Sequence, residues 1–91
     1  MSRYTPKMLD DDIESFNAEL KRHGILKRFE HGGRNGYQTV DEYSVDANGI
    51  RIGTGVDSMV GAGTSRECLG CVRQRFSDLR VSHFFDLERK S

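Results

Sequence analysis

The residues whose types and spacing could do chemistry gather in one stretch, GAGTSRECLGCV, at residues 61 to 72. Cys68 and Cys71 have the C-x2-C spacing of half a zinc site or of a redox pair. The sequence holds no second pair with that spacing, and a catalytic thiol would also need a histidine base that the sequence does not place. We therefore expect no metal and no catalytic residue, and interpret both cysteines as small packing residues that face inward.

The glycines of the same stretch could also open a phosphate-binding loop, because the free N–H groups at the start of a helix favour anions. A P-loop requires lysine and then serine or threonine directly after its last glycine, and this pattern is absent. Thr64 and Glu67 instead have the spacing of a capping box. The stretch therefore predicts the start of a helix and no bound cofactor.

Composition predicts one small domain. The chain has 91 residues, of which 35% are hydrophobic and 31% charged, and its 14 basic residues equal its 14 acidic ones. A chain without net charge has no overall electrostatic attraction to nucleic acid or to an anionic membrane. The N-terminal residues lack the apolar run of a secretory signal, and no run approaches the length of a membrane span, so we expect a cytoplasmic protein.

Apolar spacing predicts the helices. Leu9, Ile13, Phe16 and Leu20 form the stripe of a first helix that follows a lead at residues 1–8 and stops at Gly24. Thr5 and Pro6 offer an earlier start for this helix. A second helix starts at Thr64 and carries a further stripe. Its members are Cys68, Val72, Phe76 and Leu79.

Aromatic and β-branched residues predict strands between the helices. ILKRFEH and YQTVDEYSVD form a hairpin around GGRNG, and IRIGTGV, residues 50–56, forms a third strand after the Asn48-Gly49 turn. In the tail at 81–91, apolar and polar residues alternate, and we expect a short strand or an irregular segment there. The fold class is α+β, a single domain with the order α-β-β-β-α, in which two helices pack on a three-stranded antiparallel sheet.

One strand face carries an unusual combination of residues. Alternation places Asp41 on the same face as Tyr37 and Tyr43, so that an acid lies among aromatic rings, whereas the three histidines are expected at the surface. Tyrosine and arginine are enriched in binding hot spots. We therefore predict a partner-binding patch made of Arg34, Asn35, Tyr37, Asp41, Tyr43 and Arg51.

The order α-β-β-β-α with GAGTSREC leading into the last helix resembles the double-stranded RNA-binding domain. That resemblance implies binding of duplex RNA or DNA through basic residues at and after the start of this helix. The corresponding candidates here are Arg66, Arg73, Arg75 and Arg80, although Glu67 and Cys68 stand where the family has lysines, and the chain is neutral.

The run LKRFEHGGRNGYQTVDEY, the strand after it and GTSREC resemble small accessory proteins of phages and prophages. The matching positions are Arg34, Gly36, Tyr37, Val40, Asp41 and Tyr43. This resemblance implies a module without catalytic activity that inhibits a host defence system, as anti-CRISPR proteins do, by occupying a host protein or a protein–RNA complex. Phe84 and Phe85, expected to be exposed, could in addition support a homodimer.

Overall fold

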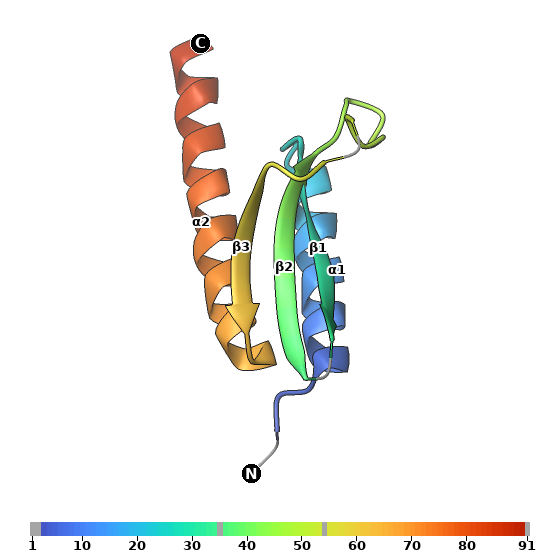
Figure 1. Ribbon diagram of the computed structural model, residues 1–91. Coiled ribbons are helices and arrows are strands. Elements are labelled where there is room, and N and C mark those ends of the chain that lie inside the picture. Colours follow the sequence, from blue (N-terminus) through green and yellow to red (C-terminus); the bar gives the residue numbers. More distant parts are fainter. Residues whose placement is uncertain (1–2, 35, 54, 91) are drawn as a thin grey trace.

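The computed structural model describes residues 3–34, 36–53 and 55–90, and these form two helices and three strands. In chain order the elements are α1 (Pro6–Arg22), β1 (Lys27–Arg34), β2 (Tyr37–Ser44), β3 (Ser58–Gly63) and α2 (Ser65–Lys90) (Figure 1). The strands pair antiparallel in the order β1-β2-β3. The predicted fold class and element order are confirmed.

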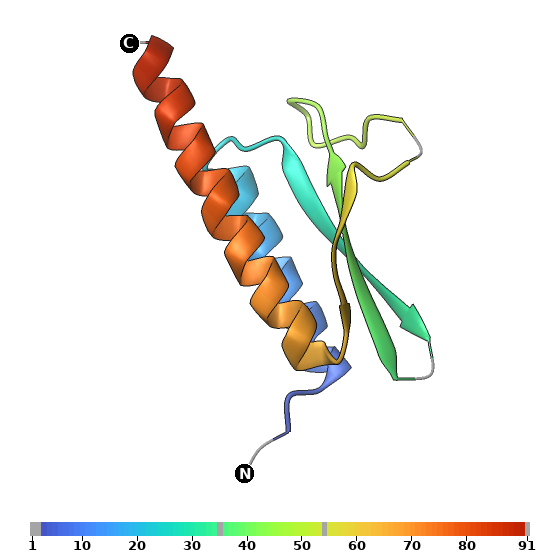
Figure 2. The same ribbon diagram turned by 60° about the vertical axis from the view of Figure 1, so that its left-hand side comes forward.

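Both helices pack on one face of the sheet, which leaves the opposite face open (Figure 2). Helix α1 lies against β1, whereas α2 lies against β3 and β2, and the two helices also contact each other. Between these layers lies a single cluster of buried apolar side chains. Its members are Leu9, Ile13, Leu20, Ile25, Phe29, Val40, Cys68, Leu69, Val72 and Leu79.

Local signals place the helix ends. The Thr5 side chain accepts a hydrogen bond from the backbone N–H of Met8, and Pro6 follows at the first helical position, so α1 takes the earlier of the two predicted starts. At the start of α2, the Thr64 hydroxyl accepts from Glu67 N at 3.1 Å and the Glu67 carboxylate accepts from Thr64 N at 3.2 Å. The predicted capping box is confirmed.

The predicted third strand is wrong. Thr54 lies outside the described residues, and the rest of 50–56 contributes only an isolated bridge from Arg51 to Val45. The third strand lies instead at Ser58–Gly63, between the predicted strand and the predicted start of the second helix. Helix α2 crosses this edge of the sheet so closely that a Cβ at Gly61 would lie 2.8 Å from the Cβ of Cys71. Small residues fit beneath the helix at this point, and this packing requirement overrides the β-branched pattern of the earlier segment.

The predicted irregular tail is also wrong, because α2 continues through residues 81–90. The alternation of apolar residues there suggested a strand, but the segment contains neither glycine nor proline to end the helix. An established helix extends one residue at a time without a new nucleation cost. The last turns of α2 consequently project beyond the sheet (Figure 1).

Candidate functional site

The outer face of the sheet gathers the polar and aromatic residues of β2. Tyr37 is 58% exposed, and Asp41 and Tyr43 are half-buried. Across the sheet, Asp41 pairs with Glu30 of β1 and with Met59 of β3, which is 64% exposed. Neighbouring residues in register point to the same face, so these side chains form one open surface. We call this surface, together with Arg51 described below, the outer patch; its members on the strands are Glu30, Tyr37, Asp41, Tyr43 and Met59.

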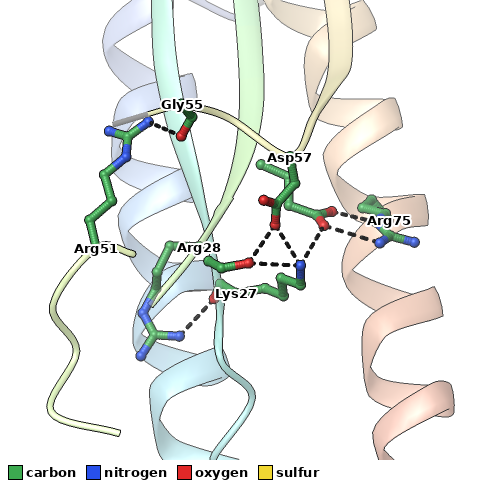
Figure 3. Close-up of polar contacts among 8 residues, drawn as sticks. Lys27, Arg28, Arg51, Gly55, Asp57 and Arg75 are labelled. Atoms are coloured by element: carbon green, nitrogen blue, oxygen red, sulfur yellow. Dashed lines mark hydrogen bonds and ion pairs between the residues drawn. The ribbon is translucent and has the colours of Figure 1, made fainter. Parts of the chain in front are cut away.

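Arg51 reaches the outer patch from the loop that follows β2. Its guanidinium carbon lies 4.2 Å from the centroid of the Tyr43 ring, and Nη1 donates to Glu30 Oε2 at 2.8 Å. Nη2 donates to the carbonyl oxygen of Gly55 at 3.2 Å (Figure 3). Stacking on an aromatic ring together with a carboxylate contact fixes a guanidinium in place before any partner arrives.

Four of the six predicted patch residues are thus brought together, namely Tyr37, Asp41, Tyr43 and Arg51. Arg34 ends β1, where its backbone pairs with that of Tyr37. Asn35 lies outside the described residues. The strand alternation read from the sequence therefore places the β2 part of the patch on one face, and the loop supplies Arg51.

The helix-facing side of the sheet holds a buried carboxylate that the sequence reasoning missed. Glu42 is 2% exposed, and its two oxygens accept from Arg75 Nε at 2.5 Å and Nη2 at 3.1 Å. Lys27 Nζ lies 3.8 Å from Glu42 Oε2. The same period of two that buries Val40 also buries Glu42, and this alternation was the available signal.

Asp57 and Ser44 extend this network at the end of the sheet (Figure 3). Lys27 Nζ lies 2.5 Å from Asp57 Oδ2, and the Ser44 hydroxyl donates to the same oxygen at 2.6 Å. The hydrogen bond from Lys27, and then that from Ser44, hold the pKa of Asp57 below its usual value. We call Lys27, Glu42, Ser44, Asp57 and Arg75 the Glu42 cluster.

Replacing Asp57 by asparagine is expected to weaken the acid dependence of stability. A carboxyl group whose folded-state pKa is lowered stabilises the fold above its unfolded-state pKa, and this contribution disappears as the pH falls through the folded-state pKa. Wild type should therefore lose stability below about pH 4 more steeply than Asp57→Asn. Urea unfolding at a series of pH values measures this, with Glu14→Gln on exposed α1 as the control. Equal slopes for wild type and Asp57→Asn would contradict the prediction.

The cysteines occupy different environments. Cys68 is fully buried and its thiol donates to the Gln38 carbonyl oxygen at 3.5 Å, which confirms its packing role. Burial raises the pKa of Cys68, so this thiol stays protonated at neutral pH and lacks the activation of a nucleophile. Cys71 is exposed and lies outside the core, at the sheet edge, where a Cβ at Gly61 would lie 3.2 Å from its Sγ. Among the described residues, no three His, Cys, Asp or Glu side chains gather to hold a metal ion.

The arginines of the nucleic-acid alternative divide into two sets, because Arg66, Arg73 and Arg80 recur every seven residues along one side of α2 and Arg75 does not. Arg75 is engaged by Glu42, and the Arg80 guanidinium carbon lies 5.9 Å from the centroid of the Phe76 ring. Arg66 and Arg73 are exposed. The neighbouring helix α1 carries five acidic residues, Asp10, Asp11, Asp12, Glu14 and Glu19, which repel phosphates.

His31 is not a surface residue, contrary to the expectation. Its side chain is 11% exposed and lies between Asp10 Oδ1, 2.5 Å from Nδ1, and Gln38 Oε1, 2.6 Å from Nε2. The first contact joins β1 to α1, and the second joins it to β2. His31 therefore ties α1 to the sheet.

Comparison with protein-family models, with curated proteins and with solved structures finds no match for this chain. Within the described part of the chain, neither helix is long and apolar enough to cross a membrane. The function must therefore be argued from the surface itself.

Proposed function

We propose that this chain is a non-catalytic binding module that docks on a macromolecular surface through the outer patch. The observation that carries the proposal is the open sheet face on which Tyr43 and Arg51 hold each other in place. Tyrosine and arginine supply most of the energy at many interfaces, and a side chain that is already ordered loses little entropy on binding. Tyr37, more than half exposed, adds contact area on the same face.

The charged groups on the helix-facing side of the sheet have a structural role. Arg75 and Lys27 are used to neutralise Glu42. A duplex-binding surface would need these and further cations free for phosphates. Duplex RNA binding is accordingly the alternative that the experiments below must separate from protein binding.

The class of target follows from the resemblance to phage and prophage accessory proteins. The proposed target is a defence complex of the host cytoplasm, a protein or a protein–RNA assembly, and inhibition follows from occupying its surface as anti-CRISPR proteins do. A face of three short strands suits a standard interface of about 800 Å² per partner. Steric occupation requires no cofactor.

Tyr43→Ala is expected to weaken binding to a purified CRISPR effector complex at least about tenfold, because it removes a contact ring and frees Arg51 to move. Arg51→Lys, which keeps the charge but not the stacked plane, should weaken binding less. Calorimetric titration measures both. Tyr43 is half-buried on an open face, so circular dichroism should show the wild-type fold.

Arg73→Ala is the matched control, because Arg73 is exposed on α2 and belongs to the nucleic-acid alternative. It should leave binding unchanged. The outer patch is not the binding site if Tyr43→Ala binds like wild type while Arg73→Ala binds more weakly and the affinity of wild type falls steeply with added salt. A titration of duplex RNA at low salt completes the comparison.

A further inference from the structure

The C-terminal part of α2 carries apolar side chains that contribute nothing to the core. Val81, Phe84, Phe85 and Leu87 are 52%, 58%, 52% and 54% exposed. The Phe84 and Phe85 rings touch edge to face, with centroids 6.0 Å apart. Contiguous exposed apolar surface of this kind marks an interaction site. We call these four residues the C-terminal patch.

After Leu79, the apolar residues of α2 lie on a different side of the helix from the residues that pack in the core. At about 100° per residue, Phe84 lies roughly 140° and Phe85 roughly 120° from Leu79, on opposite sides of it. Leu79 is buried against the core, so both phenylalanines point away from the sheet. On the side that faces α1, Phe84 and Leu87 also line a small hollow of about 150 Å³ with His23 and Ile25. An occupant of the whole patch must therefore approach from the helical side of the molecule.

The C-terminal patch is complementary to itself. A hollow of about 470 Å³ lies among Phe76, Ser77, Arg80, Val81, Phe84 and Phe85, and its apolar walls stand beside the projecting rings. A two-fold interface brings the same patch of both copies together, so each hollow can receive a ring of the other copy. Aromatic rings packed in this way gain about 0.5–1.5 kcal/mol beyond the burial of their area.

The total surface is also larger than a compact monomer of this size presents. A chain of 10.3 kDa is expected to expose roughly 5,350 Å², whereas this one exposes 6353 Å². The excess of about 1,000 Å² resembles the share that one copy contributes to a standard interface, about 800 Å². The radius of gyration, 13.8 Å against an expected value of about 12.2 Å, reflects the same projecting helix.

We propose that the chain forms a two-fold homodimer through the C-terminal patch. The α2 helices of the two copies meet on the side of the molecule opposite the outer patch, so dimerisation leaves the open sheet face of each copy accessible. A dimer then presents the outer patch twice, and two linked contacts raise the apparent affinity for a target with repeated subunits. The dimer itself does not depend on the proposed function.

Sedimentation velocity of the full chain tests the proposal. Wild type is expected to sediment as a species of twice 10.3 kDa, and the double variant Phe84→Ser with Phe85→Ser as the monomer. The dissociation constant of the dimer should rise by about a hundredfold or more, because both rings at the centre of the interface are lost. Each ring is more than half exposed, so circular dichroism should show unchanged helix content.

The matched control is Ile50→Ser with Ile52→Ser, which removes two equally exposed apolar side chains, 63% and 59%, from the loop after β2. This variant should remain dimeric. A wild-type chain that stays monomeric up to about 1 mM overturns the proposal, as does a double phenylalanine variant that dimerises like wild type. If the control alone becomes monomeric, the interface lies at the loop and the proposal is equally overturned.

Discussion

Arg75→Ala is expected to lower the free energy of unfolding by about 3 kcal/mol, which is a large fraction of the stability of a small domain. The reason lies in Glu42, which is 2% exposed and accepts two hydrogen bonds from Arg75. Truncation leaves a buried carboxylate for which, among the described residues, Lys27 at 3.8 Å is the one remaining ion-pair partner. Urea denaturation followed by circular dichroism measures the loss.

Removing both partners should be far milder than removing one. In Glu42→Leu with Arg75→Met, the buried carboxylate is gone, apolar atoms fill the space and Lys27 keeps Asp57 as its partner, so most of the lost stability should return. Arg73→Ala, two residues earlier and exposed, should change the unfolding free energy by less than about 0.5 kcal/mol. If Arg75→Ala behaves like Arg73→Ala, the pair is not structural.

The elements that the sequence predicted correctly are those with strong local signals. Helix α1 has a proline start, an apolar stripe and a glycine stop, and its glycine has the left-handed φ of 72°. The hairpin of β1 and β2 follows from alternation around a glycine cluster. These features act over a few neighbouring residues and need no knowledge of packing.

The elements that the sequence missed depend on distant contacts. The choice of Ser58–Gly63 over residues 50–56 as the third strand rests on the close approach of α2 at Gly61. The pairing of Glu42 with Arg75 joins residues 33 positions apart. Local propensity predicts neither the third strand nor this ion pair, because both depend on contacts between α2 and the sheet.

The sequence predicted only part of the arrangement that brings the outer-patch residues together. Tyr37, Asp41 and Tyr43 share a face because alternation in β2 requires it. Arg51 was expected on a strand, yet it reaches Tyr43 from a loop that bends back over the sheet. Composition identified the residue type, and only the path of the loop sets its position.

Gly33→Ala should be the most damaging single substitution in the hairpin, with a loss of about 3 kcal/mol or more. Gly33 has a φ of 146°, and a Cβ there would lie 2.4 Å from the Tyr37 carbonyl oxygen and 2.9 Å from the Gln38 Cα. Both neighbours are backbone atoms of the paired strand, so the clash cannot be relieved by a rotamer change. Strands β1 and β2 would have to separate at this end.

Gly24→Ala is the comparison variant, which introduces backbone strain without a clash. Gly24 also has a positive φ, 72°, but no described atom lies within 4 Å of a Cβ placed there, so only the strain of the left-handed conformation remains, about 1 kcal/mol. Chemical denaturation of both variants gives a difference that combines the clash at Gly33 with the difference in backbone strain between a φ of 146° and one of 72°. Because Tyr37 lies at the displaced end of β2, Gly33→Ala should also weaken binding through the outer patch, whereas Gly24→Ala should not. Equal losses of stability in the two variants would show that the hairpin accommodates the side chain.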